Sequence, residues 1–222
     1  MDFLESIPTV VIHREKDKER EIFIETFEKK MELELQRVEG MDGESLVASG
    51  HPRKHPRGDE DASYGNIGCT ATHVSILNTF LEESEFEYIC IFEDDVELIT
   101  EAIDIYEYID YSWSLPEWDI LFLGVNEIVE GEVLQEQPLL SKVKRFWGTH
   151  AVILTRKAAQ AILNTYADSL QQGYALPADW LYSFAIRNGN LTAYCPTDPR
   201  ACVQQKEGIV STCTGNLRLY SK

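Results

Sequence analysis

Five apolar or aromatic residues run directly into three carboxylates in the segment Tyr88-Ile89-Cys90-Ile91-Phe92-Glu93-Asp94-Asp95. A strand that lacks polar alternation is typical of a sheet that is buried on both faces. In open α/β sheets, ligands bind outside the carboxyl ends of the strands, and the three acidic side chains fall at that point. The segment therefore predicts an α/β fold with an acidic site at one edge of its central sheet.

Further apolar strands and amphipathic helices alternate on both sides of this segment. Such alternation predicts an open, mostly parallel sheet that is covered by helices. We expect strands at 9–12, around Leu33 and Leu35, at 119–123 and at 149–154. We expect helices that begin near Asp17, Asn66, Glu101, Thr155 and Asp179, the last of them ending at Gly189. Because we find no internal repeat and no linker, the pattern indicates one domain over residues 1–222.

Composition and charge exclude several classes of protein. Hydrophobic residues make up 44% of the 222 residues and charged residues 26%, which is typical of a globular protein with a sizeable core. The net charge is -18, from 20 basic and 38 acidic residues, and it disfavours binding to nucleic acids and to anionic membranes. No apolar run approaches the roughly 20 residues of a transmembrane helix. Residues 1–8 lack the features of a signal peptide and the five cysteines lack CxxC spacing, so we expect a cytoplasmic location.

The acidic triplet is a candidate metal site. Glu93, Asp94 and Asp95 repel one another at close range, and a divalent cation relieves that repulsion. Oxygen-only ligands favour a hard ion such as Mn²⁺ or Mg²⁺. Along an extended backbone, Glu93 and Asp95 point to one side and Asp94 to the other. Taken alone, the triplet is equally compatible with a solvated acidic turn after a strand.

Two motifs stand out near the triplet: Ile67-Gly68-Cys69-Thr70-Ala71-Thr72-His73 and Ile91-Phe92-Glu93-Asp94-Asp95-Val96. Others occur before and after them: Val11-Ile12 through Arg20, Trp118 to Gly124, Gly148-Thr149-His150-Ala151-Val152 with Ala158-Ala159, Pro177-Ala178-Asp179, and Pro196 to Gln204. In their joint order and spacing they resemble glycosyltransferase family 25, which includes bacterial lipooligosaccharide galactosyltransferases and procollagen galactosyltransferases. The resemblance covers most of the chain.

The resemblance implies a fold of the GT-A type and a metal-dependent transfer of a sugar, such as galactose or glucose, from a UDP-sugar donor to an acceptor hydroxyl. The acceptor would be a glycan or a glycosylated protein. It implies that Glu93 and Asp95 bind Mn²⁺ or Mg²⁺ between the donor phosphates, and that Asp94 contacts the ribose or acts through water. It makes Asp179 the general base of an inverting reaction, although Asp179 is almost equally consistent with an ordinary helix cap. Glu127 and Asp119 are the reserve candidates for the base.

The resemblance also indicates substrate-binding residues, each of which has a simpler structural explanation. They are His13, Arg14, Arg20, Thr72, His73, Trp147, Gly148 and Gln204. A histidine within a helix or an apolar strand, such as His73 or His150, is often a hydrogen-bonded core residue. Arg20 could pair with a diphosphate or with neighbouring glutamates, and Trp147 could stack on a sugar or simply pack in the core. Gln204, or Gln205 beside it, could contact the metal or the nucleotide.

Some residues depart from the family pattern. Asn66 stands where the family usually has Glu, Thr72 replaces Ser, and His13-Arg14 replaces Asn-Leu, which affects the expected donor contacts of the first strand. Two other functions remain open. The first is a binding module that keeps the fold without catalysis. The second is a nucleotidyltransferase, which is disfavoured because the basic residues near the first strand lack a glycine-rich phosphate loop.

Overall fold

The computed structural model describes residues 3–58, 60–115, 117–211, 213 and 215. Within them, eight strands form one sheet in the order β2-β1-β3-β8-β5-β9-β7-β6. The strands are β1 (Thr9–His13), β2 (Gln36–Glu39), β3 (Tyr88–Glu93), β5 (Ile120–Gly124), β6 (Glu127–Leu134), β7 (Gln137–Trp147), β8 (Ala151–Thr155) and β9 (Ala193–Pro196). Two short strands, β4 (Val96–Leu98) and β10 (Val203–Gln205), pair separately in antiparallel fashion.

The sheet is mixed, with most strands pointing the same way. Parallel pairings join β1 to β2, β1 to β3 and β5 to β9, and antiparallel pairings place β8 between β3 and β5. The hairpin β6–β7 extends the far edge through the antiparallel pair β7–β9. Only β7 and β8 therefore run against the direction shared by the other six strands of this sheet. The α/β class is confirmed, and the carboxyl ends of β1, β3 and β5 meet at one edge.

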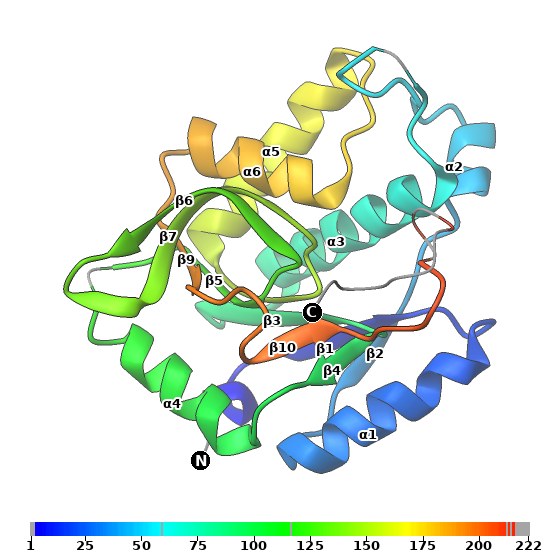
Figure 1. Ribbon diagram of the computed structural model, residues 1–222. Helices are drawn as coiled ribbons and strands as arrows, with labels where there is room; N and C mark the ends of the chain where they lie inside the picture. The colour runs from blue at the N-terminus through cyan, green and yellow to red at the C-terminus, as the bar shows by residue number, and fades with distance from the viewer. Residues whose placement is uncertain (1–2, 59, 116, 212, 214, 216–222) are drawn as a thin grey trace.

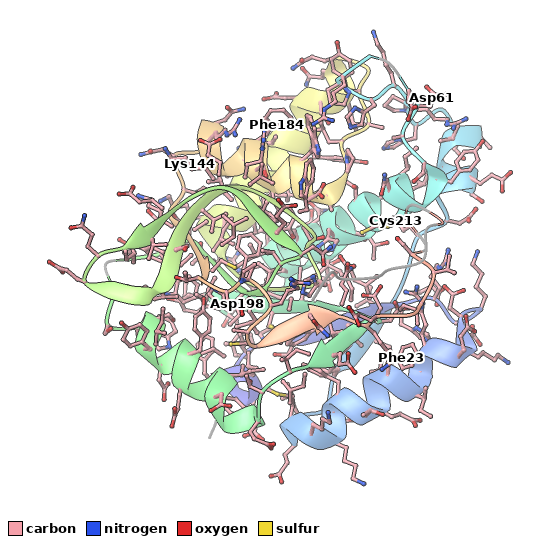
Figure 2. The ribbon with its side chains drawn as sticks, in the orientation of Figure 1. Phe23, Asp61, Lys144, Phe184, Asp198 and Cys213 are labelled. Carbon is pink, nitrogen blue, oxygen red and sulfur yellow. The ribbon has the colours of Figure 1, made fainter. Side chains whose placement is uncertain are left out.

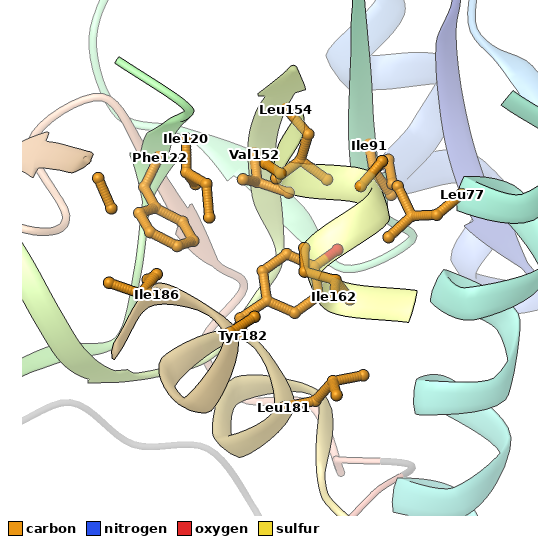
Figure 3. Packing of buried hydrophobic residues seen from close by; sticks show 14 of the residues in the cluster. Leu77, Ile91, Ile120, Phe122, Val152, Leu154, Ile162, Leu181, Tyr182 and Ile186 are labelled. Carbon is orange, nitrogen blue, oxygen red and sulfur yellow. The ribbon is translucent and has the colours of Figure 1, made fainter. Parts of the chain in front are cut away.

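Helices cover both faces of the sheet (Figure 1). The helices α3 (Tyr64–Glu83), α5 (Arg156–Gln171) and α6 (Ala178–Asn188) lie on one face, and α1 (Glu21–Met31) and α4 (Ala102–Ser112) lie on the other. Figure 3 shows the first of the two resulting cores, in which Leu77, Ile162 and Tyr182 pack on Ile91 and Val152 of the strands. Consecutive residues of β3 alternate between the two cores, which explains why its sequence is continuously apolar.

Several helix boundaries follow from hydrogen bonds to side chains. Thr155 caps α5 as predicted, because its hydroxyl accepts from the Ala158 N–H. The predicted cap of α3 was wrong: Ser63 accepts from the Asn66 N–H, so the helix begins before Asn66. Asp17 does not cap α1 either, because its carboxylate binds Arg14 and a short 3₁₀ turn, Lys18–Arg20, separates it from the helix.

The second predicted strand was misplaced by a few residues. Leu33 and Leu35 are buried, but they belong to the segment that leaves α1, where Glu32 adopts a left-handed conformation. The strand itself is β2 (Gln36–Glu39), which pairs with β1. At the other end of the chain, α6 ends at Gly189 as predicted, although this glycine has a negative φ of -82° and was not required for a left-handed turn. Among the described helices, none combines the length and the apolar character needed to cross a bilayer.

Candidate active site

A cavity of about 240 Å³ opens at the carboxyl ends of β1 and β3. Its walls come from the end of β1, the segment before α2 (Gly43–Ala48), the first turns of α3, the acidic triplet and the C-terminal segment. The lining residues include His13, Arg14, Arg20, Thr72, Cys69, Glu93, Asp94, Asp95 and Cys213. The cavity therefore lies at the edge of the sheet where the sequence predicted the acidic triplet.

Glycines allow the backbones around this cavity to approach closely. A Cβ atom on Gly68 would lie 2.3 Å from the Met41 carbonyl oxygen, and one on Gly43 would lie 1.9 Å from the Tyr64 carbonyl oxygen. Any side chain at either position would thus force α3 away from the segment 41–43. Gly68 belongs to the motif 67–73, and its lack of a side chain lets the start of α3 pack closely beside the cavity.

Glu93 is held in place by neighbours from three distant segments. Its Oε1 accepts a hydrogen bond of 2.8 Å from Thr149, and its Oε2 accepts one of 3.1 Å from Gln205. His73 Nε2 lies 3.7 Å from Oε1. Burial raises the pKa of Glu93, but His73, His150 and Thr149 together outweigh burial and hold the pKa at about 2. Glu93 is thus a fixed carboxylate at neutral pH.

Asp94 is engaged in an ion-pair network with β1 and with the turn that follows it. Its carboxylate accepts from Arg20 and, at 3.0 Å, pairs with His13 Nδ1. His13 Nε2 in turn lies 3.3 Å from Glu21. Burial lowers the pKa of Arg20, but Asp94 and Asp95 outweigh burial and raise it, so the guanidinium stays charged. Asp94, His13 and Arg20 therefore hold each other in place at the wall of the cavity.

Asp95 completes the triplet, with its side chain only 2% exposed and its Oδ2 3.5 Å from Arg20 Nη1. Arg20 thus faces two of the three carboxylates, while Glu93 is held by Thr149, Gln205 and His73. The three carboxylates lie close together in a largely buried space, and the oxygen-only donors of Glu93 and Asp95 fit a hard divalent cation such as Mn²⁺ or Mg²⁺.

Asp179 lies in the first turn of α6 and approaches the same site from the helical layer. Its Oδ1 accepts from the Trp180 N–H at 2.8 Å and its Oδ2 from the Gly148 N–H at 3.4 Å. Burial is the main cause that raises its pKa to about 6. The charge of Glu93 raises this pKa further, while hydrogen bonds from backbone N–H groups lower it. Asp179 is therefore a buried carboxylate that is ionised at pH 7.5 and more basic than an ordinary aspartate.

The remaining predicted residues divide into those at the cavity and those outside it. Arg14 and Thr72 line the cavity. The Thr72 hydroxyl also accepts a hydrogen bond from the Met41 N–H and donates one to the Gly68 carbonyl, and Arg14 forms an ion pair with Asp17. Gly148 has a φ of +87°, and its N–H points to Asp179. Trp147 packs against Trp180, with ring centroids 6.3 Å apart.

Gln204 is not part of this arrangement. Successive residues of β10 point to opposite sides, so Gln204 donates to Glu97 while Gln205 reaches Glu93. Asn126 donates to Gln205 in turn. Thr149 is thus a contact of the triplet that the site predicted from the sequence did not include, and Gln205 was named there only as an alternative to Gln204. Thr149 stands in the quoted motif 148–152, whereas the position of Gln205 depends on the pairing of β10 with β4.

The reserve candidates for the base differ in their distance from Asp179. Asp119 precedes β5 at the opposite end of that strand, where it binds Lys157 and the Thr192 N–H. Glu127 is exposed at the start of β6, where it pairs with Trp147, the residue before Gly148.

The loop 51–58 packs on the helical layer. His55 contacts the Trp180 ring, and Arg57 lies over the same ring at 4.6 Å.

The sequence was then compared with known proteins. The model of a family described as glycosyltransferase family 25 (LPS biosynthesis protein) matches residues 7–181, which is most of the chain. The chain belongs to glycosyltransferase family 25. The matched range includes β1, the motif 67–73, the acidic triplet and Asp179, and with them most of the residues that line the cavity. No curated protein matches the sequence.

Solved structures that resemble the chain have low sequence identity to it. One is a STIV protein, with 12% identity, a TM-score of 0.42, and coverage of 86% of this chain and 83% of that one. Another is a Drosophila β-1,4-galactosyltransferase 7 in complex with manganese, UDP-Gal and xylobiose, with 12% identity, a TM-score of 0.44, and coverage of 89% and 69%. A third is the CTP:phosphocholine cytidylyltransferase of Streptococcus pneumoniae, with 7% identity, a TM-score of 0.43, and coverage of 91% and 74%.

Proposed function

We propose that this family 25 glycosyltransferase transfers a hexose from a UDP-sugar to a hydroxyl group of a glycan or glycoprotein, with inversion and with the help of Mn²⁺ or Mg²⁺. One observation carries the proposal more than any other. Asp179, whose pKa is raised to about 6, is close enough to the buried acidic triplet that the charge of Glu93 adds to this rise. The raised pKa suits a general base and the triplet suits a cation that carries a diphosphate.

Glu93 and Asp95 are the proposed metal ligands. A divalent cation held by these two carboxylates would supply positive charge against the donor diphosphate and the departing nucleotide. Thr149 and Gln205 fix the Glu93 carboxylate so that it does not need to reorganise when the donor binds. Arg20 adds a permanent positive charge beside Asp94 and Asp95, and it limits the repulsion between the triplet and the phosphates.

The donor would occupy the cavity at the ends of β1 and β3, with Arg14 and Thr72 among its walls. Asp94 and His13 would orient the ribose side of the donor, directly or through the ion-pair network that they form with Arg20. The sugar would then extend toward Gly148 and Asp179. In this proposal one domain would carry the whole reaction, and the nucleotide would bind at the strand edge, as in other open α/β folds.

The acceptor would approach from the helical layer. Trp147 and Trp180 offer aromatic faces near Asp179, and such faces stack well on the apolar side of a sugar ring. Asp179 would accept the proton of the acceptor hydroxyl while that oxygen attacks the anomeric carbon from the side opposite the leaving phosphate. Its two backbone hydrogen bonds hold the carboxylate in one orientation during this step.

Binding of UDP measured by calorimetry tests the proposed donor site. We expect UDP to bind in the presence of Mn²⁺ and at least about tenfold more weakly after chelation, since removal of the cation leaves the phosphates facing a net negative cavity. Equal UDP affinity with and without the metal would contradict the proposed role of Glu93 and Asp95.

A further inference from the structure

A second cluster of metal-ligating atoms lies on the helical side of Glu93. Cys69 Sγ, a nitrogen of His73 and a carboxylate oxygen of Glu93 all lie within 4.8 Å of one another. Cys69 and His73 are separated by four positions on α3, so they lie on the same face of that helix, one turn apart. The combination of sulfur, nitrogen and oxygen ligands differs in kind from the oxygen-only pair of Glu93 and Asp95.

His73 is oriented as a ligand would be. Its side chain is fully buried, and its Nδ1 is 2.9 Å from the Tyr182 hydroxyl, which fixes the ring. Its Nε2 faces Glu93 Oε1 at 3.7 Å, which is an ion-pair distance but is longer than a hydrogen bond. A metal ion between the ring nitrogen and the carboxylate would contact both groups at once.

The distances suit a tetrahedral ion. In a zinc site, nitrogen and oxygen ligands at about 2.0–2.1 Å from the metal are roughly 3.4 Å apart, close to the separation of His73 Nε2 and Glu93 Oε1. The other ligand pairs, at up to 4.8 Å, need only small side-chain rotations to close on the ion. Cys69 and Glu93 both line the cavity described above, which gives the ion a path from solvent.

We propose that Cys69, His73 and Glu93 form a binding site for Zn²⁺, with a fourth position open to the cavity. Thiolate and imidazole ligands select a borderline-soft ion such as Zn²⁺ over Mn²⁺ or Mg²⁺. On binding, the Cys69 thiol transfers its proton to solvent as the Zn–S bond forms, so one proton is released for each ion bound. The C-terminal segment brings a second thiol, that of Cys213, to the wall of the same cavity (Figure 2).

The site goes beyond the proposed transfer reaction and also affects it, because Glu93 belongs to both ligand sets. An ion on the helical side would engage the carboxylate that the donor-binding ion needs. We therefore expect Zn²⁺ to compete with Mn²⁺ and to inhibit sugar transfer in the presence of Mn²⁺.

Titration with Co²⁺, a spectroscopic substitute for Zn²⁺, tests the site without any measurement of transfer. We expect a thiolate-to-cobalt charge-transfer band in the near ultraviolet that Zn²⁺ abolishes and Mn²⁺ does not. Cys69→Ser should remove the band and weaken Zn²⁺ binding by at least about tenfold. Loss of a residue that only orients a metal ligand already lowers metal affinity by about 10–100-fold, and loss of a ligand itself should lower it at least as much. Asp95→Asn, which changes only the oxygen-ligand set, should keep the band.

Cys213→Ser is the matched control for the second thiol at the cavity, and thermal melting of each variant checks that it is folded. Retention of the band in Cys213→Ser and its loss in Cys69→Ser would assign the sulfur ligand to Cys69. Absence of the band in the wild-type protein, or its retention in folded Cys69→Ser, would overturn the proposal. Neither result depends on whether the protein transfers a sugar.

Discussion

Gln205 Nε2 donates a hydrogen bond of 3.1 Å to Glu93 Oε2, and this contact joins residues that are 112 positions apart. Glu93 ends β3 in the large sheet, while Gln205 ends β10 in the small one. Asn126, which follows β5, donates to Gln205 and extends the chain of contacts. The acidic triplet is thus tied to the C-terminal part of the chain.

Replacement of Gln205 by alanine should loosen Glu93 without removing a proposed ligand. Residues that orient a metal ligand typically contribute about 10–100-fold to metal affinity, so we expect Mn²⁺-dependent UDP binding to weaken by about tenfold. Gln204→Ala is the matched control, because its side chain points to the opposite face and binds Glu97. Calorimetry on both variants measures the difference. Equal effects of the two substitutions would show that contact with Glu93 is not what matters.

Asp95→Asn should abolish Mn²⁺-dependent UDP binding and leave the protein folded. Arg20 keeps its closer partner, Asp94, so the melting temperature should change little. Asp94→Asn should behave differently, since it weakens the buried pairs with Arg20 and His13 and should cost on the order of 2 kcal/mol of unfolding free energy. Unchanged UDP affinity in folded Asp95→Asn would remove Asp95 from the ligand set.

Asp179→Asn should lower the transfer rate by about 10²–10⁴-fold while donor affinity stays the same, because a general base acts only as the acceptor attacks. The asparagine oxygen can still accept the shorter bond, from the Trp180 N–H, while the 3.4 Å bond from the Gly148 N–H is lost. Asp119→Asn, at the opposite end of β5, is the control and should transfer sugar at the wild-type rate. A wild-type rate in Asp179→Asn would return this residue to a structural role.

The raised pKa of Asp179 also predicts an effect of pH on stability. The pKa moves from 3.8 to about 6, so the folded state holds the proton more tightly than the unfolded state does. Ionisation of Asp179 therefore lowers the free energy of unfolding as pH rises from about 4 to about 6. The protein remains less stable by this amount at higher pH. At pH 7.5, Asp179→Asn should melt at the same temperature as the wild type or higher. A lower melting temperature would mean that the charged carboxylate is stabilising.

The same pKa sets the acid limb of the rate profile. A base must be ionised to accept a proton, so kcat/KM should fall as pH decreases through about 6. An ordinary aspartate would place this limb near pH 4. The measurement is kcat/KM between pH 5 and pH 8 at saturating Mn²⁺, in the range where Glu93, with a pKa of about 2, does not titrate. A flat profile down to pH 5 would exclude Asp179 as the base.

The sequence predicted the strands that position the site because their apolar character is local. The residues of β3 are buried on both sides and run into the triplet, and this pattern needs no knowledge of the partners. The motif that ends at His73 likewise falls on one predicted helix. The α/β class and the location of the triplet at the edge of the sheet were therefore accessible before the structure.

The contacts within the site were less accessible, because they depend on tertiary pairing. A strand of three residues such as β10 shows no periodicity, so nothing in its sequence indicates that Gln205 rather than Gln204 meets Glu93. The prediction that Asn66 caps α3 was wrong for a related reason. Serine and asparagine are equally good caps, and the packing of Gly68 against Met41, which fixes the position of α3, is a tertiary contact. The hairpin β6–β7, which the sequence analysis did not identify, begins with the largely exposed edge strand β6, in which apolar and charged residues do not alternate regularly.

Release of nucleotide from a panel of UDP-, GDP- and CMP-sugars, with Mn²⁺ and after exhaustive chelation, tests the central claim most directly. In the presence of an acceptor glycan, we expect UDP to be released from a UDP-hexose with Mn²⁺, the release to stop on chelation, and Mn²⁺ to restore it. UDP release that continues at the same rate after complete removal of divalent cations would contradict the account, as would a donor panel from which the folded protein releases no nucleotide under any condition.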